Sequence, residues 1–115
     1  MLRFDEQNHG QTVEADSGQE VEIYLQENPT AGFRWQVVQT GEPICTLVSE
    51  TFDPGRKAPG QAGVHSWKFK VVAEGTASIE LVYRRSWDIT AAAGHTFTLC
   101  LNGKKQRAAK GSRKN

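Results

Sequence analysis

Two cysteines and three histidines are the side chains of this sequence that could carry nucleophilic or metal chemistry: Cys45, Cys100, His9, His65 and His95. A cysteine nucleophile needs a nearby base and an accessible thiolate. Both cysteines fall inside apolar segments, and no sequence motif links either of them to a histidine. The histidines also lack the close spacing of zinc ligands. The sequence therefore argues against an enzyme, and it predicts no metal site and no cofactor.

Two cysteines are too few for a disulfide framework. We interpret both as small buried hydrophobic residues. A single bridge between Cys45 and Cys100 stays open as the alternative.

A second group of residues is suited to binding rather than to catalysis, and the first segment of this group spans residues 27–32. With the residue that follows, it contains Asn28, Pro29, Thr30, Ala31, Gly32 and Phe33. Pro29 fixes its own φ, Gly32 permits a positive φ, and Asn28 can cap a turn with its side chain. The pattern predicts a stiff protruding turn whose small tip, Thr30 and Ala31, fits a narrow cleft. An ordinary β-turn would explain the proline and the glycine equally well.

Two further segments have a composition suited to binding. Residues 53–63 end in Gly60, Gln61, Ala62 and Gly63, whose small side chains leave backbone groups available to an extended partner. Residues 85–94 begin with Arg85, Ser86 and Trp87, and exposed Trp and Arg are the types enriched at binding hot spots. The alternatives are a plain surface loop for the former and a Trp87 folded back over the fold for the latter.

Short runs of alternating apolar and polar residues must position these segments. They span residues 10–15, 19–26, 33–40, 44–52, 64–73, 76–84 and 95–102. Alternation with period two turns one side of each strand toward a core, as with Trp67, Phe69 and Val71. Trp35 is likewise expected in the core. Regularly spaced short strands predict an all-β protein, an antiparallel sandwich or a small barrel.

The connections between these runs alternate in length. Residues 16–18, 41–43 and 74–75 form tight turns, whereas residues 27–32, 53–63 and 85–94 form what we call the first, second and third long loops. If successive strands run up and down, the three long loops share one end of the fold. Loops clustered at one end of a rigid sandwich commonly form a binding surface. Three unrelated surface loops are the alternative.

Taken together, the three long loops resemble the chagasin family of cysteine-peptidase inhibitors. The signature of that family has an Asn-Pro-Thr-Thr-Gly-Phe stretch, a Gly-x-Gly-Gly stretch and an Arg-Pro-Trp stretch, in this order. Residues 28–33, 60–63 and 85–87 match them here, and the resemblance runs from about residue 10 to about residue 102. Three positions depart from the signature: Ala31 replaces a threonine, Ala62 a glycine and Ser86 a proline.

The resemblance implies an immunoglobulin-like antiparallel β-sandwich of about seven strands. It also implies a reversible, competitive inhibitor of papain-like cysteine peptidases. Thr30 and Ala31 would enter the cleft beside the catalytic cysteine, and the backbone of residues 60–63 would pair along one flank. Arg85 and Trp87 would contact the other flank. We expect a monomer whose partner is a papain-like peptidase.

Length and charge place the rest of the chain. The 115 residues suffice for one domain, expected over residues 1–103. Residues 104–115 carry six basic residues and no acidic one, and we expect a disordered tail there. The remainder has eight basic and thirteen acidic residues, so it is not a basic nucleic-acid-binding domain. Contact of the tail with nucleic acid or an anionic membrane is the alternative.

No apolar run approaches the roughly 18–20 residues of a membrane span. Residues 1–10 also lack the apolar run of a signal peptide, so we expect a cytoplasmic protein unless a leader was removed. Because sandwiches serve many functions, a second interpretation remains: a non-inhibitory module that binds carbohydrate or mediates adhesion through Trp87 and Tyr83.

Overall fold

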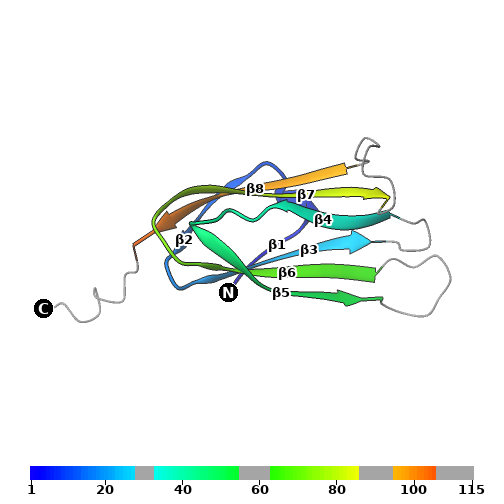
Figure 1. Cartoon of the computed structure of the whole chain (residues 1–115), viewed down its shortest axis with the longest axis horizontal. Helices are drawn as coiled ribbons and strands as arrows, with labels where there is room; N and C mark the ends of the chain where they lie inside the picture. The colour runs from blue at the N-terminus through cyan, green and yellow to red at the C-terminus, as the bar shows by residue number, and fades with distance from the viewer. Residues whose placement is uncertain (28–32, 55–62, 86–94, 106–115) are drawn as a thin grey trace, which may run out of the picture.

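Two four-stranded sheets form a sandwich in the computed structural model, which describes residues 1–27, 33–54, 63–85 and 95–105. The first sheet has the strand order β1-β3-β6-β5, and the second has the order β2-β8-β7-β4. The strands of both sheets run along the long axis of the molecule (Figure 1). The predicted all-β sandwich is therefore confirmed, and two separate sheets rule out the barrel.

Eight strands lie within the described ranges. They are β1 (Leu2–Phe4), β2 (Thr12–Asp16), β3 (Glu20–Glu27), β4 (Phe33–Gln39), β5 (Cys45–Asp53), β6 (Gly63–Val71), β7 (Gly75–Arg85) and β8 (His95–Lys104). Seven of them correspond to the expected strands, with ends that agree to within two residues. The structure adds β1, a strand of three residues that the sequence analysis did not predict. Among the described residues, no helix is long and apolar enough to cross a membrane.

The N-terminal segment departs from a purely antiparallel sandwich. β1 pairs in parallel with β3, and β2 pairs in parallel with β8, so the chain crosses from the first sheet to the second between them. A 3-10 helix (Glu6–Asn8) makes this crossing. The Asp5 carboxylate accepts a hydrogen bond from the Gln7 amide, and the Asn8 side chain accepts one from the Asp5 amide, both at 2.9 Å. This reciprocal pair caps the helix.

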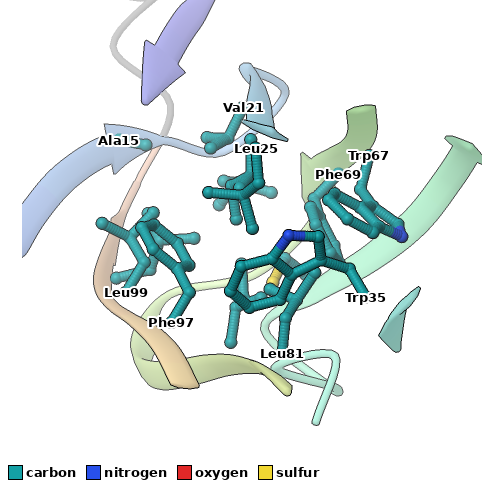
Figure 2. Close-up of a cluster of buried hydrophobic side chains, with 14 residues drawn as sticks. Ala15, Val21, Leu25, Trp35, Trp67, Phe69, Leu81, Phe97 and Leu99 are labelled. Atoms are coloured by element: carbon teal, nitrogen blue, oxygen red, sulfur yellow. The ribbon is translucent and has the colours of Figure 1, made fainter. Parts of the chain in front are cut away.

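The core lies between the sheets and consists of the inward-facing residues of the alternating strands. Figure 2 shows side chains from both sheets meeting there. As predicted, Trp35 and Trp67 are buried, with 7% and 1% of their surface exposed. The remaining members are Ala15, Val21, Ile23, Leu25, Cys45, Phe69, Val71, Ile79, Leu81, Phe97, Leu99 and Leu101. Burying each large apolar side chain contributes about 1.5–3 kcal/mol, so this core gives the loops a rigid support.

The strand ends that lead into the three long loops lie together at one end of the sandwich. In the first sheet Glu27 pairs with Gly63, and Asp53 pairs with Val64. In the second sheet Phe33 pairs with Arg85, and Tyr83 with His95. The arrowheads of β3, β5 and β7 accordingly point to the same end (Figure 1). The predicted clustering of the loop-bearing ends is confirmed.

The tight turns gather at the opposite end, where backbone hydrogen bonds join them. The amide of Gly18 donates to Val71 at 2.7 Å, that of Ser17 donates to Lys104 at 2.7 Å, and that of Val72 donates to Ile44 at 2.8 Å. Lys104 thus belongs to β8, although the sequence analysis assigned it to the tail. Of the rest of the expected tail, Lys105 is described and exposed, and residues 106–115 lie outside the described residues.

Candidate functional site

Most of the residues predicted to contact a partner lie outside the described part of the chain. They are Asn28, Pro29, Thr30, Ala31, Gly32, Gly60, Gln61, Ala62, Ser86 and Trp87. The described ones are Phe33, Gly63 and the backbone of Arg85, and each stands at the end of a strand. The structure therefore describes the base of the candidate site rather than its tips.

The order of the strands determines how the three loops are arranged at this base. β3 and β4, which carry the first long loop, belong to different sheets, so the two ends of this loop stand on different sheets. β5 and β6 carry the second long loop at one side, in the first sheet. β7 and β8 carry the third at the other side, in the second sheet. Since β3 is paired with β6 and β4 with β7, the ends of the first loop lie between those of the other two.

A row of aromatic rings supports the ends of the first and third loops. The Phe33 ring lies 5.5 Å from that of Tyr83, which lies 4.9 Å from Trp35 and 6.0 Å from His95. Tyr83 is half-buried and packs against the core. These contacts join β4, β7 and β8 directly beneath the loops. Tyr83 therefore supports the ends of the loops, whereas the carbohydrate interpretation uses it as a residue that contacts the ligand.

Gly63 occupies a position where no side chain fits. A Cβ atom built there would lie 2.5 Å from the Asp53 carbonyl oxygen and 2.9 Å from the Cα atom of Pro54. Both are backbone atoms and cannot move aside cheaply. The absence of a side chain lets the two ends of the second loop approach closely, a packing role beyond the backbone pairing expected from the sequence.

The sequence analysis missed a buried carboxylate at the end of β3. Glu27 is completely buried and accepts three hydrogen bonds. One oxygen accepts from the Trp35 amide and from His65 Nδ1, both at 2.8 Å, and the other accepts from Arg34 Nε at 2.6 Å. One signal could have revealed it. Glu27 continues the inward-facing series of β3, where every earlier member is apolar.

His65 lies between two carboxylates and two aromatic rings. Its Nε2 atom is 2.6 Å from a carboxylate oxygen of Glu50, in addition to its contact with Glu27. Its ring stacks on that of Trp67, with the ring centroids 4.0 Å apart. It meets the Phe52 ring edge-on, with the centroids 5.7 Å apart. A histidine donates from both ring nitrogens, and so satisfies two ionised carboxylates together, only when it is protonated. We call Glu27, Arg34, Glu50 and His65 the loop-base cluster.

Opposing influences act on the Glu27 carboxyl. Burial acts to raise its pKa, but the hydrogen bonds from the Trp35 amide, His65 and Arg34, together with the charge of His65, hold the pKa below its usual value of 4.5. A carboxyl with a lowered pKa in the folded state stabilises the protein fully above its unfolded-state pKa. That contribution is lost as the pH falls through the folded-state value.

We therefore expect the free energy of unfolding to decrease more steeply below about pH 4.5 in the wild type than in Glu27→Gln. Urea denaturation at a series of pH values measures this slope. Glu22→Gln is the matched control, because Glu22 lies on the same strand but pairs at the surface with Arg3. An equal slope in the wild type and Glu27→Gln would contradict the expectation.

The cysteines lie away from the loop ends, and both are free. The bridge that the sequence left open is therefore not formed. Burial, with a smaller contribution from the charge of Glu42, raises the pKa of the Cys45 thiol to about 11. Its Sγ atom donates to the Thr40 carbonyl oxygen at 3.1 Å. A protonated, buried thiol is not a nucleophile. No set of three or more His, Cys, Asp or Glu side chains in the described residues could hold a metal ion.

Comparison with known proteins identifies the class to which this fold and loop arrangement belong. The family described as chagasin family peptidase inhibitor I42 matches residues 14–101. The chain belongs to this family. It is 31% identical to chagasin of Trypanosoma cruzi over 99 aligned residues, and the alignment covers 82% of this chain and 90% of chagasin. It is 37% identical over 105 residues to amoebiasin-1 of Entamoeba histolytica, which covers 88% of this chain and 98% of the relative.

Solved structures share the fold. The cysteine protease inhibitor EhICP2 from Entamoeba histolytica superposes with a TM-score of 0.76 at 20% identity, covering 90% of this chain and 94% of that one. PbICP-C, solved in complex with falcipain-2, has a TM-score of 0.54 at 17% identity, covering 90% and 89%. At these identities the likeness bears on the fold alone. The relatives in sequence are peptidase inhibitors rather than enzymes.

Proposed function

We propose that this chain is a reversible, competitive inhibitor of papain-like cysteine peptidases, which blocks the active-site cleft with its three long loops. The observation that carries the proposal is membership of the chagasin family over residues 14–101, a range that spans all three loops. The architecture supports it, because the ends of the three loops lie together on a rigid sandwich. EhICP2, which shares the fold, is itself a cysteine protease inhibitor.

The first long loop acts as the wedge that enters the cleft. Its ends stand between those of the other two loops, which is the central place that a wedge requires. Thr30 and Ala31 lie beside the catalytic cysteine and exclude substrate. Pro29 lacks an amide donor and has a fixed φ, which disfavours the extended conformation that a peptidase cleaves. The inhibitor therefore occludes the site without being consumed.

The second and third loops flank the wedge on opposite sides. The backbone of residues 60–63 pairs with the peptidase as an added strand, because small side chains leave its donors and acceptors accessible. Arg85 and Trp87 contact the other flank, where Trp87 packs against an apolar, aromatic surface of the peptidase. Asn28, Gly32 and Phe33 shape the first loop. Residues 105–115 follow β8 and lie beyond the family match, so we assign them no part in inhibition.

Titration of papain activity with the purified full chain, with a small fluorogenic substrate, tests the proposal. We expect competitive inhibition with a submicromolar inhibition constant, because loops held on a rigid scaffold are ordered at small entropic cost. Assays at several substrate concentrations separate competitive from other inhibition. The product of a long incubation shows whether residues 28–33 stay uncleaved.

Absence of inhibition would contradict the proposal. The highest inhibitor concentration to be tested is about 100 µM. At that concentration even a weak complex, with a binding free energy of about −5 kcal/mol, is measurably populated. A cathepsin L-like enzyme serves as the second peptidase in the same assay. If neither is inhibited, the carbohydrate-binding interpretation is tested next on a glycan array with Trp87→Ala as the comparison.

A further inference from the structure

The loop-base cluster ties together the ends of two of the three long loops. Glu27 is the last residue of β3, directly before residues 28–32, and Arg34 is the second residue of β4, directly after them. His65 is the third residue of β6, shortly after residues 55–62, and Glu50 lies in the neighbouring strand β5, where it pairs with Trp67. All four side chains are joined in one series of hydrogen bonds, from Arg34 through Glu27 and His65 to Glu50.

This series also holds the two sheets together at the loop end. Glu27 belongs to the first sheet, whereas its donors Arg34 and Trp35 belong to the second. A further bond reinforces the link, since the indole Nε1 of Trp35 donates to the carbonyl oxygen of Gln26 at 2.8 Å. The two ends of the first loop are therefore joined by three hydrogen bonds across the sandwich. Their spacing is set below the loop rather than by the loop itself.

At the second loop, packing fixes the orientation of the His65 ring. His65 is only 4% exposed, and its ring stacks on Trp67 and meets Phe52 edge-on. With both nitrogens at carboxylate oxygens, it links β3 to β5 through β6. The guanidinium of Arg34 lies 5.7 Å from the centroid of the Phe52 ring, so β4 and β5 are also linked where they adjoin the first and second loops.

A fully buried charge is a poor way to gain stability but a strong way to select one arrangement. Desolvation of a carboxylate is costly, and the cost is offset only when its donors stand in place. If the ends of the loops move apart, Glu27 remains buried without compensation. An apolar side chain at this inward-facing position would pack equally well in several arrangements. The cluster therefore favours a single spacing of the ends of the first and second loops.

We propose that Glu27 and His65 are positioning residues for inhibition: they hold the first and second long loops at the separation that fits the peptidase cleft, without touching the peptidase. This inference rests on the proposed function and adds the residues that make its loops ready to bind. Burial supports the indirect role, because neither Glu27 nor His65 has surface to offer a partner. Arg34 and Glu50, whose side chains are 46% and 49% exposed, complete the cluster from the rim.

The rate constants of binding distinguish a positioning residue from a contact residue. When only a fraction of molecules holds the competent arrangement, the apparent affinity falls by that fraction. The association rate constant then falls, while the complex, once formed, dissociates as before. Loss of a direct contact instead raises the dissociation rate constant. A purely structural residue changes neither constant at a temperature where the protein is folded.

The test measures association and dissociation of full-length wild type, Glu27→Gln and His65→Gln with papain by stopped-flow fluorescence. Thermal melts first confirm that each protein is folded at the assay temperature. We expect association to be about tenfold slower in each variant, with dissociation unchanged within about twofold. The double variant should be little slower than the slower single variant, because both changes disrupt one cluster. Glu22→Gln, on the same strand but away from the loops, should keep wild-type rates.

Two results would overturn the inference: wild-type association rates in the folded variants, or a change confined to dissociation. If Glu27→Gln does not fold, Arg34→Met is tested in its place, because it removes one hydrogen-bond donor to Glu27 from the exposed rim. Its association with papain is expected to be slower in the same way. A wild type that inhibits while the variants match it refutes only the positioning role. A wild type that fails to inhibit papain refutes the proposed function, and this inference falls with it.

Discussion

Thr30→Arg is expected to raise the inhibition constant for papain by about 100-fold or more. In the proposed complex Thr30 lies at the tip of the wedge, in the narrowest part of the cleft. An arginine there is too large to enter, and forcing it in would bury a charge without a partner. Such burial costs about 3 kcal/mol or more, which corresponds to the expected factor. Inhibition of papain with a fluorogenic substrate measures the constant.

Thr76→Arg is the matched control for this change. Thr76 is exposed and lies at the end of the sandwich opposite to the long loops, where its hydroxyl donates to Asn102 at 3.0 Å. The same substitution there should leave the inhibition constant within about twofold, because a surface change is usually nearly neutral. If both variants inhibit like the wild type, the first loop does not enter the cleft. If both lose inhibition, the effect is one of charge or folding.

The strands were predictable because local alternation and global burial agree. In β6, Trp67, Phe69 and Val71 face the core, while Lys68 and Lys70 between them do not. Near the ends of the strands, alternation predicts the burial of side chains less well. Phe33 and Tyr83 continue the alternation of β4 and β7 but are only half-buried, since they stand at the loop end of the sandwich.

The N-terminal segment shows what alternation cannot reveal. β1 has three residues, too few to display a period of two. Its pairing with β3 is parallel, and no turn signal marks a parallel partner because the connection runs through other elements. The crossing from one sheet to the other depends on a tertiary arrangement that a local pattern does not encode.

Part of the candidate site could be predicted from local sequence patterns and part could not. Proline, glycine and an isolated tryptophan mark the three loops, because those residue types have local conformational or surface preferences. The loop-base cluster has no such mark. Glu27 and His65 are 38 positions apart, and only the pairing of β3 with β6 brings them together. Gly63 likewise has no local mark, because the carbonyl oxygen that leaves no room for a side chain there belongs to another strand, β5.

Trp87→Ala is expected to weaken inhibition by about 30-fold or more while leaving the melting temperature nearly unchanged. A tryptophan that acts as a hot spot of an interface typically contributes about 2 kcal/mol or more to binding, which gives this factor. Ser86 stands where the family has a proline, so Ser86→Pro is expected to change inhibition in the opposite direction by making the loop stiffer. The papain titration and a thermal melt of each variant measure both effects.

Trp67→Ala supplies the contrast that gives this result its meaning. Trp67 is 1% exposed and stacks on His65, so its removal leaves a cavity in the core. Such a change typically costs about 3–5 kcal/mol, which lowers the melting temperature by about 12 °C or more in a domain of this size. If Trp87→Ala shows a similar fall in melting temperature, Trp87 is a core residue folded back over the sandwich. If it melts like the wild type and has lost inhibition, Trp87 contacts the peptidase directly.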